Sequence, residues 1–484
     1  MKLNNPELLR SQCLINGEWC DALSGKREAV INPATGAELA SIPLVSEEET
    51  QQAIAAAQRA QNDWKQLTAK QRSALLLAWA DKVLAAQEDL AQLMTAEQGK
   101  SLAEARGEVA YAASFITWFA EEAKRVDGAV LQAPQASQRL VVVKQPIGVC
   151  AAITPWNFPA AMITRKVAPA LAAGCTIIVK PAEQTPLTAL ALAKLAQDAG
   201  IPAGVLQVVT GEAAQVGKVL CDSPMVRKLS FTGSTEVGRI LMAQCAPSIK
   251  KLSLELGGNA PVIVFDDANL DAAVAGIMAS KFRNSGQTCV CANRIYVQDG
   301  IYERLAEKLV AAVEQLKVGD GSQEGTTQGP LIDSDAVAKV QSHIDDALIK
   351  GAQIATGGQP HALGGTFFQP TVVTGVTQKM RFAKEETFGP VAPLFRFHDE
   401  AEAIAMANDT EFGLAAYLFT QNAARQWRVP EALEYGMVGI NTGLISNEVA
   451  PFGGVKQSGL GREGSRYGIE EYLELKYLCI DVSR

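Results

Sequence analysis

The alternation of hydrophobic and polar positions divides the chain into a helical first part and a longer region in which strands and helices alternate. Up to about residue 130, apolar residues recur three or four positions apart, which predicts mainly amphipathic helices. From residue 140, runs that are apolar throughout alternate with amphipathic stretches. Fully apolar runs are typical of strands buried on both faces. The pattern therefore predicts a parallel sheet wrapped by helices, as in nucleotide-binding folds.

The boundaries of these elements follow from capping signals and from the ends of the apolar runs. Ser46-x-x-Glu49 and Thr68-x-x-Gln71 fit the capping box and predict two helix starts. Strands are predicted at 139–144, 149–154, 176–180, 205–210, 228–232 and 251–255, and helices at 160–173, 185–199, 213–221 and 235–245. A second α/β series, from near Pro261 to about residue 460, predicts a second domain.

Composition and charge exclude several classes of protein. The 484 residues carry 44 lysines and arginines against 52 aspartates and glutamates, without a basic block, which disfavours nucleic acid and anionic membranes as partners. Apolar stretches are too short for a membrane helix, and the polar start does not resemble a signal peptide. Nine cysteines in so long a chain are not a disulfide framework. We expect a reduced, soluble, cytoplasmic protein.

Two glycine motifs are candidate phosphate loops. Gly459-x-Gly461-x-x-Gly464 matches the dinucleotide fingerprint only as a pattern, because it follows a loop rather than a buried strand, and we interpret it as a tight turn. The segment 231–238, Phe-Thr-Gly-Ser-Thr-Glu-Val-Gly, lies between a predicted strand and a predicted helix. Its helix start offers N–H groups to a phosphate, and the alternative is an ordinary strand–turn–helix junction.

The segment 286–291, Gly-Gln-Thr-Cys-Val-Cys, offers a nucleophile. A zinc site is disfavoured, because no second cysteine pair is near and the chain has only the histidines His343, His361 and His398. A thiolate at Cys289 would add to an electrophilic carbon, although a packing role stays open. Glu255 ends an apolar strand beside two glycines, where burial would raise its pKa toward that of a useful base.

Seven motifs then occur in a recognisable order: Thr154-Pro-Trp-Asn-Phe-Pro159, Lys180-Pro-Ala-Glu183, Phe231-Thr-Gly-Ser234, Leu254-Glu-Leu-Gly-Gly258, Gly286-Gln-Thr-Cys289, Glu386-Thr-Phe-Gly-Pro390 and Pro451-Phe-Gly-Gly454. Together they resemble the aldehyde dehydrogenase superfamily over essentially the whole chain. The closer resemblance is to succinate-semialdehyde dehydrogenases, through Ala161-Met-Ile-Thr-Arg-Lys166, Lys281-Phe-Arg-Asn284, Cys289-Val-Cys291 and Leu444-Ile-Ser446.

The resemblance implies a Rossmann-type cofactor domain, an α/β catalytic domain and an oligomerisation arm. We place the cofactor domain at 1–125 and 147–256 and the catalytic domain at 257–469. The arm takes 126–146 and 470–484, where polar and apolar residues alternate. The family's fold also implies a homodimer or homotetramer.

The resemblance also assigns roles to residues. Cys289 matches the nucleophile, Asn157 the oxyanion donor and Glu255 the base that activates water, whereas Lys166 matches a lysine without an assigned role. Residues matching cofactor contacts are Thr154, Trp156, Lys180, Glu183, Gly233, Ser234, Glu386 and Phe388. A carboxylate at Glu183 would repel a 2′-phosphate, so NAD is preferred and NADP possible, and no metal is expected.

Two arginines near the reacting groups suggest the substrate. Arg165 lies eight residues after Asn157 and Arg283 six before Cys289, and guanidinium binds a carboxylate in a forked geometry. They predict a short aldehyde with a distal carboxylate. Ser446 matches a serine that adds a hydrogen bond in the resembled enzymes, and the resemblance implies oxidation of succinic semialdehyde to succinate, with glutaric semialdehyde or a broader range of short aldehydes as the alternative. An acylating dehydrogenase that uses coenzyme A, and a structural protein without activity, are the rival classes. The presence of Glu255 argues against the first.

Cys289 and Cys291 are also a candidate redox switch. Two residues apart, their Cα atoms span at most about 6.6–7.2 Å, whereas disulfides need roughly 4.4–6.8 Å, so the loop has to bend. A bond of this kind would be strained and easily reduced.

Overall fold

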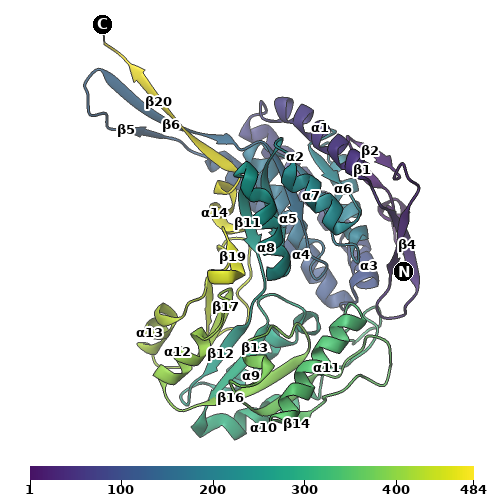
Figure 1. Ribbon diagram of the computed structural model, residues 1–484, viewed down its shortest axis with the longest axis vertical. Coiled ribbons are helices and arrows are strands. Elements are labelled where there is room, and N and C mark those ends of the chain that lie inside the picture. The colour runs from purple at the N-terminus through teal and green to yellow at the C-terminus, as the bar shows by residue number, and fades with distance from the viewer. Residues whose placement is uncertain (484) are drawn as a thin grey trace.

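The computed structural model describes residues 1–483 and shows two α/β bodies with a thin sheet projecting from the upper one (Figure 1). The helices of the upper body are α1 (Glu47–Trp64), α2 (Ala69–Ala85), α3 (Gln87–Gln98), α4 (Leu102–Glu122), α5 (Ala161–Ala173), α6 (Pro186–Asp198), α7 (Ala213–Asp222) and α8 (Thr235–Cys245). Those of the lower body are α9 (Leu270–Lys281), α10 (Tyr302–Val313), α11 (Ser334–Ile349), α12 (Glu400–Asn408) and α13 (Arg425–Ala432). None of the helices formed by residues 1–483 has the length and apolar character needed to cross a membrane.

The upper body is built on an eight-stranded sheet of order β19-β11-β10-β7-β8-β9-β1-β2. Its strands are β1 (Cys13–Ile15), β2 (Glu18–Cys20), β7 (Val149–Ile153), β8 (Thr176–Lys180), β9 (Leu206–Val208), β10 (Val226–Thr232), β11 (Lys251–Glu255) and β19 (Gly459–Leu460). The five central strands are parallel, and β7 and β8 are almost entirely buried, as their apolar sequences predicted. Both predicted capping boxes are present, at Ser46 and Thr68.

The first 43 residues differ from the prediction of a mainly helical beginning. Apart from a short 3-10 turn, η1 (Pro6–Leu8), they form β1, β2, β3 (Arg27–Ile31) and β4 (Glu38–Pro43), and the first α-helix begins only at Glu47. These strands have three to six residues and are largely half-exposed, so no apolar run marks them. Strand β1 gains its stability by pairing antiparallel with β9, 194 residues further along at Leu14↔Val208, a contact that local periodicity does not encode.

The lower body holds a seven-stranded sheet of order β14-β15-β16-β13-β12-β17-β18. Its strands are β12 (Ala260–Val264), β13 (Ala292–Gln298), β14 (Gln353–Thr356), β15 (Thr371–Val376), β16 (Val391–Phe397), β17 (Ala415–Phe419) and β18 (Met437–Ile440). All pairs are parallel except β14 with β15. The prediction of a second α/β unit from near Pro261 is thereby confirmed.

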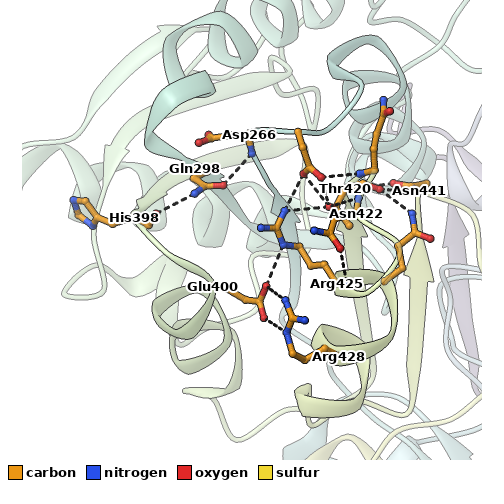
Figure 2. A network of polar contacts seen from close by, with 12 residues as sticks. Asp266, Gln298, His398, Glu400, Thr420, Asn422, Arg425, Arg428 and Asn441 are labelled. Carbon is orange, nitrogen blue, oxygen red and sulfur yellow. Dashed lines mark hydrogen bonds and ion pairs between the residues drawn. The ribbon is translucent and has the colours of Figure 1, made fainter.

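Polar side chains join the carboxyl ends of these strands (Figure 2). The amide of Gln298, at the end of β13, accepts from the Asp266 N–H at 2.9 Å and donates to the His398 carbonyl at 3.0 Å. Arg425 contacts Thr420, which follows β17, and forms an ion pair with Glu400 at 3.1 Å. The carboxyl edge of the lower sheet is therefore occupied by contacts that stabilise the fold.

The projecting sheet combines two distant segments. It consists of β5 (Ala129–Leu131), β6 (Gln138–Pro146) and β20 (Leu473–Asp481), and β6 pairs antiparallel with β20 over its whole length. The short helix α14 (Ser465–Glu470) leads into it. The sheet extends away from both bodies (Figure 1), and its large apolar side chains are exposed: Val130, Leu131, Leu475, Tyr477, Leu478 and Ile480.

Candidate active site

The candidate active site lies where the carboxyl edge of the upper sheet meets the amino edge of the lower one. Gly233 and Ser234 follow β10, and Leu256 follows β11, whereas Cys289 precedes β13. All four line one cavity of about 300 Å³. The upper sheet thus follows the rule that parallel sheets bind ligands beyond their carboxyl ends, and the lower sheet supplies side chains from the opposite edge.

Most of the predicted site residues line this cavity. They are Trp156, Asn157, Arg165, Gly233, Ser234, Arg283, Cys289, Glu386, Phe388 and Ser446. Thr154, Lys166, Glu255 and Cys291 are buried behind its wall, each next in sequence to a residue that lines it. Lys180 is buried too and pairs with Glu183. Glu183 lines a neighbouring groove, which shares Ile332 and Asp333 with the cavity.

The loop before Cys289 has an unusual backbone. Asn284 and Ser285 both have left-handed φ angles, of 50° and 54°, in a short helical turn, η4 (Arg283–Gly286). Gly286 has a φ of 75°, and a Cβ there would collide with the backbone of Gly389. The loop is therefore pressed against the segment that carries Glu386, and only glycine permits this approach.

Asn157 is fixed from two sides. Its side-chain Nδ2 donates to the Gln287 carbonyl at 2.9 Å, and its own carbonyl accepts from Lys100 Nζ at 2.8 Å and from Asn284 Nδ2 at 3.0 Å. Lys100 forms a buried ion pair with Glu108. Since an amide has two N–H bonds, one fixes the side chain and the other can serve a ligand in the cavity.

Burial shifts the ionisation of the groups in the cavity. It raises the pKa of the Cys289 thiol to about 12, although Arg165 acts in the opposite direction. Burial also raises the pKa of Glu386 to about 7, while Lys339 and the Gly258 N–H, which donates at 3.1 Å, lower it. The thiol is therefore neutral at rest and needs a base to become a nucleophile.

A cluster of charges lies behind the wall next to Glu255. Burial, and then the Glu463 carboxylate, raise the pKa of Glu255 well above its ordinary range, against the effect of Arg165 and Lys166. Glu463 pairs with Lys166 and, at 2.7 Å, with Arg165 Nε. Neither carboxylate oxygen of Glu255 has a hydrogen-bond partner among residues 1–483. The carboxyl group is thus available to a water molecule or to a proton.

The end of the cavity formed by α4 and α5 is rich in donors. Arg283 forms no ion pair within the described chain, and its guanidinium lies 5.2 Å from the centre of the Phe158 ring. Arg165 packs over the Phe452 ring at 4.0 Å, and its Nη2 is buried without a partner in residues 1–483. The cationic groups are held in place, and part of their hydrogen-bonding capacity stays unused.

The turn after β10 has the shape of a phosphate cradle. A Cβ on Gly233 would collide with the Phe231 ring, and Ser234 caps α8 by accepting from the Val237 N–H at 3.3 Å. The start of a helix provides N–H groups and a positive dipole for a phosphate. By contrast, the 459–464 motif begins as the edge strand β19, which pairs with β11, and bends only after it, with positive φ angles at all three glycines. The prediction of a tight turn was therefore wrong for Gly459 and Leu460.

Reasoning from the sequence missed four residues of this site: Tyr111, Lys100, Glu108 and Glu463. Tyr111 lies on a helix whose apolar stripe identified only core positions. Glu463 is buried and lies inside the glycine motif interpreted as a turn. The signal in the sequence that could have found it was a carboxylate between Gly461 and Gly464. No group of histidine, cysteine, aspartate or glutamate side chains suited to a metal is found among residues 1–483.

The fold and the cavity together define a protein of two α/β bodies with a cysteine in the cavity between them, and comparisons with known proteins give the family. The model of the aldehyde dehydrogenase family matches residues 19–478. The chain belongs to this family.

Curated relatives and a solved structure match this chain over 99–100% of its length. A succinate-semialdehyde dehydrogenase of Escherichia coli (strain K12), named as an NADP(+) enzyme, is 65% identical over 99% of this chain and 100% of its own. A glutarate-semialdehyde dehydrogenase of Pseudomonas putida is 65% identical over 100% of both. The crystal structure of an aldehyde dehydrogenase from Brucella melitensis biovar abortus 2308 has 64% identity and a TM-score of 0.99, covering 100% of both chains.

Proposed function

We propose that the protein oxidises succinic semialdehyde to succinate with a nicotinamide cofactor. The observation that carries this is Arg283, a cation without a carboxylate partner in the described chain, in the same cavity as Cys289 and Arg165. A cationic end opposite a thiol suits a short aldehyde with a distal carboxylate. The names of the two relatives support this substrate class. Glutaric semialdehyde, one methylene longer, is the alternative, since one methylene changes binding by only about 1–3 kcal/mol.

In this proposal Cys289 is the nucleophile. The thiol releases its proton to solvent as its sulfur adds to the aldehyde carbon, and the oxyanion accepts hydrogen bonds from the Asn157 amide and from the Cys289 backbone N–H. A bound nicotinamide supplies the hydride acceptor. Glu255 takes a proton from water, which hydrolyses the resulting thioester to the carboxylic acid and restores the thiol. Lys166, paired with Glu463 behind the cavity wall, balances the charges around Glu255.

Arg283→Ala tests the substrate. We expect kcat/KM for succinic semialdehyde to fall about 10- to 100-fold, because a hydrogen-bonded charge contact is lost, while kcat/KM for butanal stays unchanged. Steady-state kinetics with both aldehydes and with glutaric semialdehyde measure this. The control is Arg396→Ala, which removes a half-exposed guanidinium paired with Glu303. If kcat/KM of the parent enzyme for butanal equals that for succinic semialdehyde, the proposal fails.

We also propose where the cofactor binds. The turn at Gly233 and Ser234 suits the pyrophosphate, Glu386 and Phe388 suit the nicotinamide ribose, and Lys180 and Glu183 suit the adenosine ribose. The Phe388 ring meets the Trp156 ring edge to face at 5.6 Å, which stiffens that end of the cavity. Thr154, although assigned here by resemblance, is buried directly after β7 and would act through the backbone.

Glu183 supports a preference for NAD. It lines the groove next to the cavity and forms an ion pair with Lys180. If the adenosine ribose binds in this groove, a carboxylate there would repel a 2′-phosphate. The E. coli relative carries NADP(+) in its name, which speaks for the other cofactor, so the preference needs a direct test at this residue. We expect Glu183→Ser to raise the ratio of kcat/KM for NADP to that for NAD at least tenfold. An unchanged ratio would remove Glu183 from the argument.

The predicted domain boundaries and assembly remain part of the proposal. The two sheets support a cofactor domain at 1–125 and 147–256 and a catalytic domain at 257–469, and the projecting sheet supports an arm at 126–146 and 470–484. The exposed apolar side chains of that sheet favour a homodimer or homotetramer. Light scattering of the purified protein checks this, and a monomer would contradict it.

A further inference from the structure

Tyr111, on α4, has a buried hydroxyl that no other group of residues 1–483 contacts by a hydrogen bond. The side chain lines the cavity that contains Cys289. Three other buried tyrosines each donate to a backbone carbonyl: Tyr302 to Leu394, Tyr417 to Val290 and Tyr435 to Ala407. Because an unpaired buried hydroxyl destabilises a protein by about 1–3 kcal/mol, an orphan in a cavity points to a ligand.

The groups around this hydroxyl are those of the cationic end of the cavity. Burial raises the pKa of Tyr111, whereas the positive charges of Arg165 and Arg283 lower it and the Cys289 thiol raises it further. The phenol therefore stays neutral and donates a hydrogen bond. Its ring packs edge to face on Phe115, one turn further along α4, at 4.8 Å, which fixes the direction of the hydroxyl.

Donors dominate this end of the cavity. Guanidinium groups only donate, and a phenol next to them is best satisfied as a donor too. A group that accepts from Tyr111, Arg165 and Arg283 together has to be an anion with several oxygens, such as a carboxylate or a sulfonate. A neutral aldehyde of the same length leaves the Tyr111 hydroxyl, Arg165 Nη2 and the Arg283 guanidinium unpaired, and an amine is repelled.

We propose that the Tyr111 hydroxyl donates a hydrogen bond to the distal anionic group of the substrate and is a specificity-determining residue. This inference rests on the function proposed above and names a residue that discriminates against uncharged aldehydes. It predicts that the residue acts on substrate affinity and leaves the chemistry at Cys289 unchanged.

Tyr111→Phe tests this, because the substitution removes only the oxygen. We expect kcat/KM for succinic semialdehyde to fall roughly 10- to 100-fold, mainly through KM, and that for butanal to change less than twofold. Succinate, used as an inhibitor of butanal oxidation, should bind the variant weaker by a similar factor, which measures the anion contact without semialdehyde turnover. The matched control is Tyr302→Phe, which removes a buried hydroxyl outside the cavity and should leave the preference intact.

The outcomes separate the two proposals. A parent enzyme without preference for the semialdehyde over butanal overturns the proposed function. A parent with this preference, and a Tyr111→Phe variant in which both aldehydes lose activity equally or neither does, overturns the role of Tyr111 alone. If Tyr111→Phe lowers the preference for succinic semialdehyde over butanal while Tyr302→Phe does not, and if succinate inhibits Tyr111→Phe more weakly, both the proposed function and the role of Tyr111 are supported.

Discussion

Replacing Glu255 with glutamine is expected to lower steady-state turnover by about 10²- to 10⁴-fold, the range lost with a general base. The first turnover should persist if the thioester forms on Cys289 and only its hydrolysis needs the carboxylate. A stopped-flow record should then show a burst of reduced nicotinamide close to the enzyme concentration, followed by a slow phase. Loss of the burst together with the slow phase would show that Glu255 is needed before hydrolysis.

The same residue predicts a pH dependence. Since burial and Glu463 raise the pKa of Glu255, the carboxyl group is protonated, and useless as a base, below that raised pKa. The hydrolysis rate of the parent should therefore rise with pH up to the shifted pKa and level off above it. In Glu255→Gln this rise of the hydrolysis rate with pH should disappear. A rise that persists would belong to another group.

Glu463→Gln is the matched variant for this argument. It removes the carboxylate that raises the pKa of Glu255 and frees the positive charges of Arg165 and Lys166, which lower it. The pH-dependent rise of the hydrolysis rate should move to lower pH, and no burst should appear, since hydrolysis stays fast. A rise that does not move would mean that Glu463 does not act on the ionisation of Glu255.

Hydrogen peroxide is expected to abolish activity reversibly through Cys289 and Cys291. Both thiols are free in the structure, and the backbone between them bends, because the Cys291 N–H donates to the Thr288 carbonyl at 3.1 Å. The Cys291 sulfur now donates to the Lys281 carbonyl at 3.2 Å and would have to turn away to close the bond. Two thiols and one peroxide give one disulfide and two waters, and dithiothreitol should restore full activity.

Cys291→Ala separates this switch from simple oxidation. Without a resolving thiol, oxidised Cys289 should proceed to its sulfinic form, and recovery with dithiothreitol should fall from nearly complete to a small fraction. Residual activity before and after reductant, measured over a series of peroxide exposures, checks this. A variant that is inhibited and rescued like the parent would exclude Cys291 from the chemistry.

The strands of the upper sheet show what local pattern can determine. Strand 176–180 was predicted to the residue, because burial on both faces of a parallel sheet leaves a continuous apolar run. The bounds of helix 235–245 and of strand 251–255, in which apolar and polar residues alternate, were also predicted to the residue. The short strands before residue 44 had no such run. Strand β1 gains stability by pairing with β9 far along the chain, whereas β3 and β4 pair with each other, and most side chains of these strands are at least partly exposed.

By itself the sequence determined the class of the protein and its reactive groups, because nucleophile, base and oxyanion donor are chemical identities that short motifs carry. Only the tertiary structure decided that the two sheets meet by opposite edges, and that Glu255 lies behind the cavity wall among Arg165, Lys166 and Glu463. It also decided that the Tyr111 hydroxyl and Arg283 lack partners in the described chain. The physical reason is that burial and hydrogen-bond satisfaction depend on segments hundreds of residues apart, which no local pattern specifies.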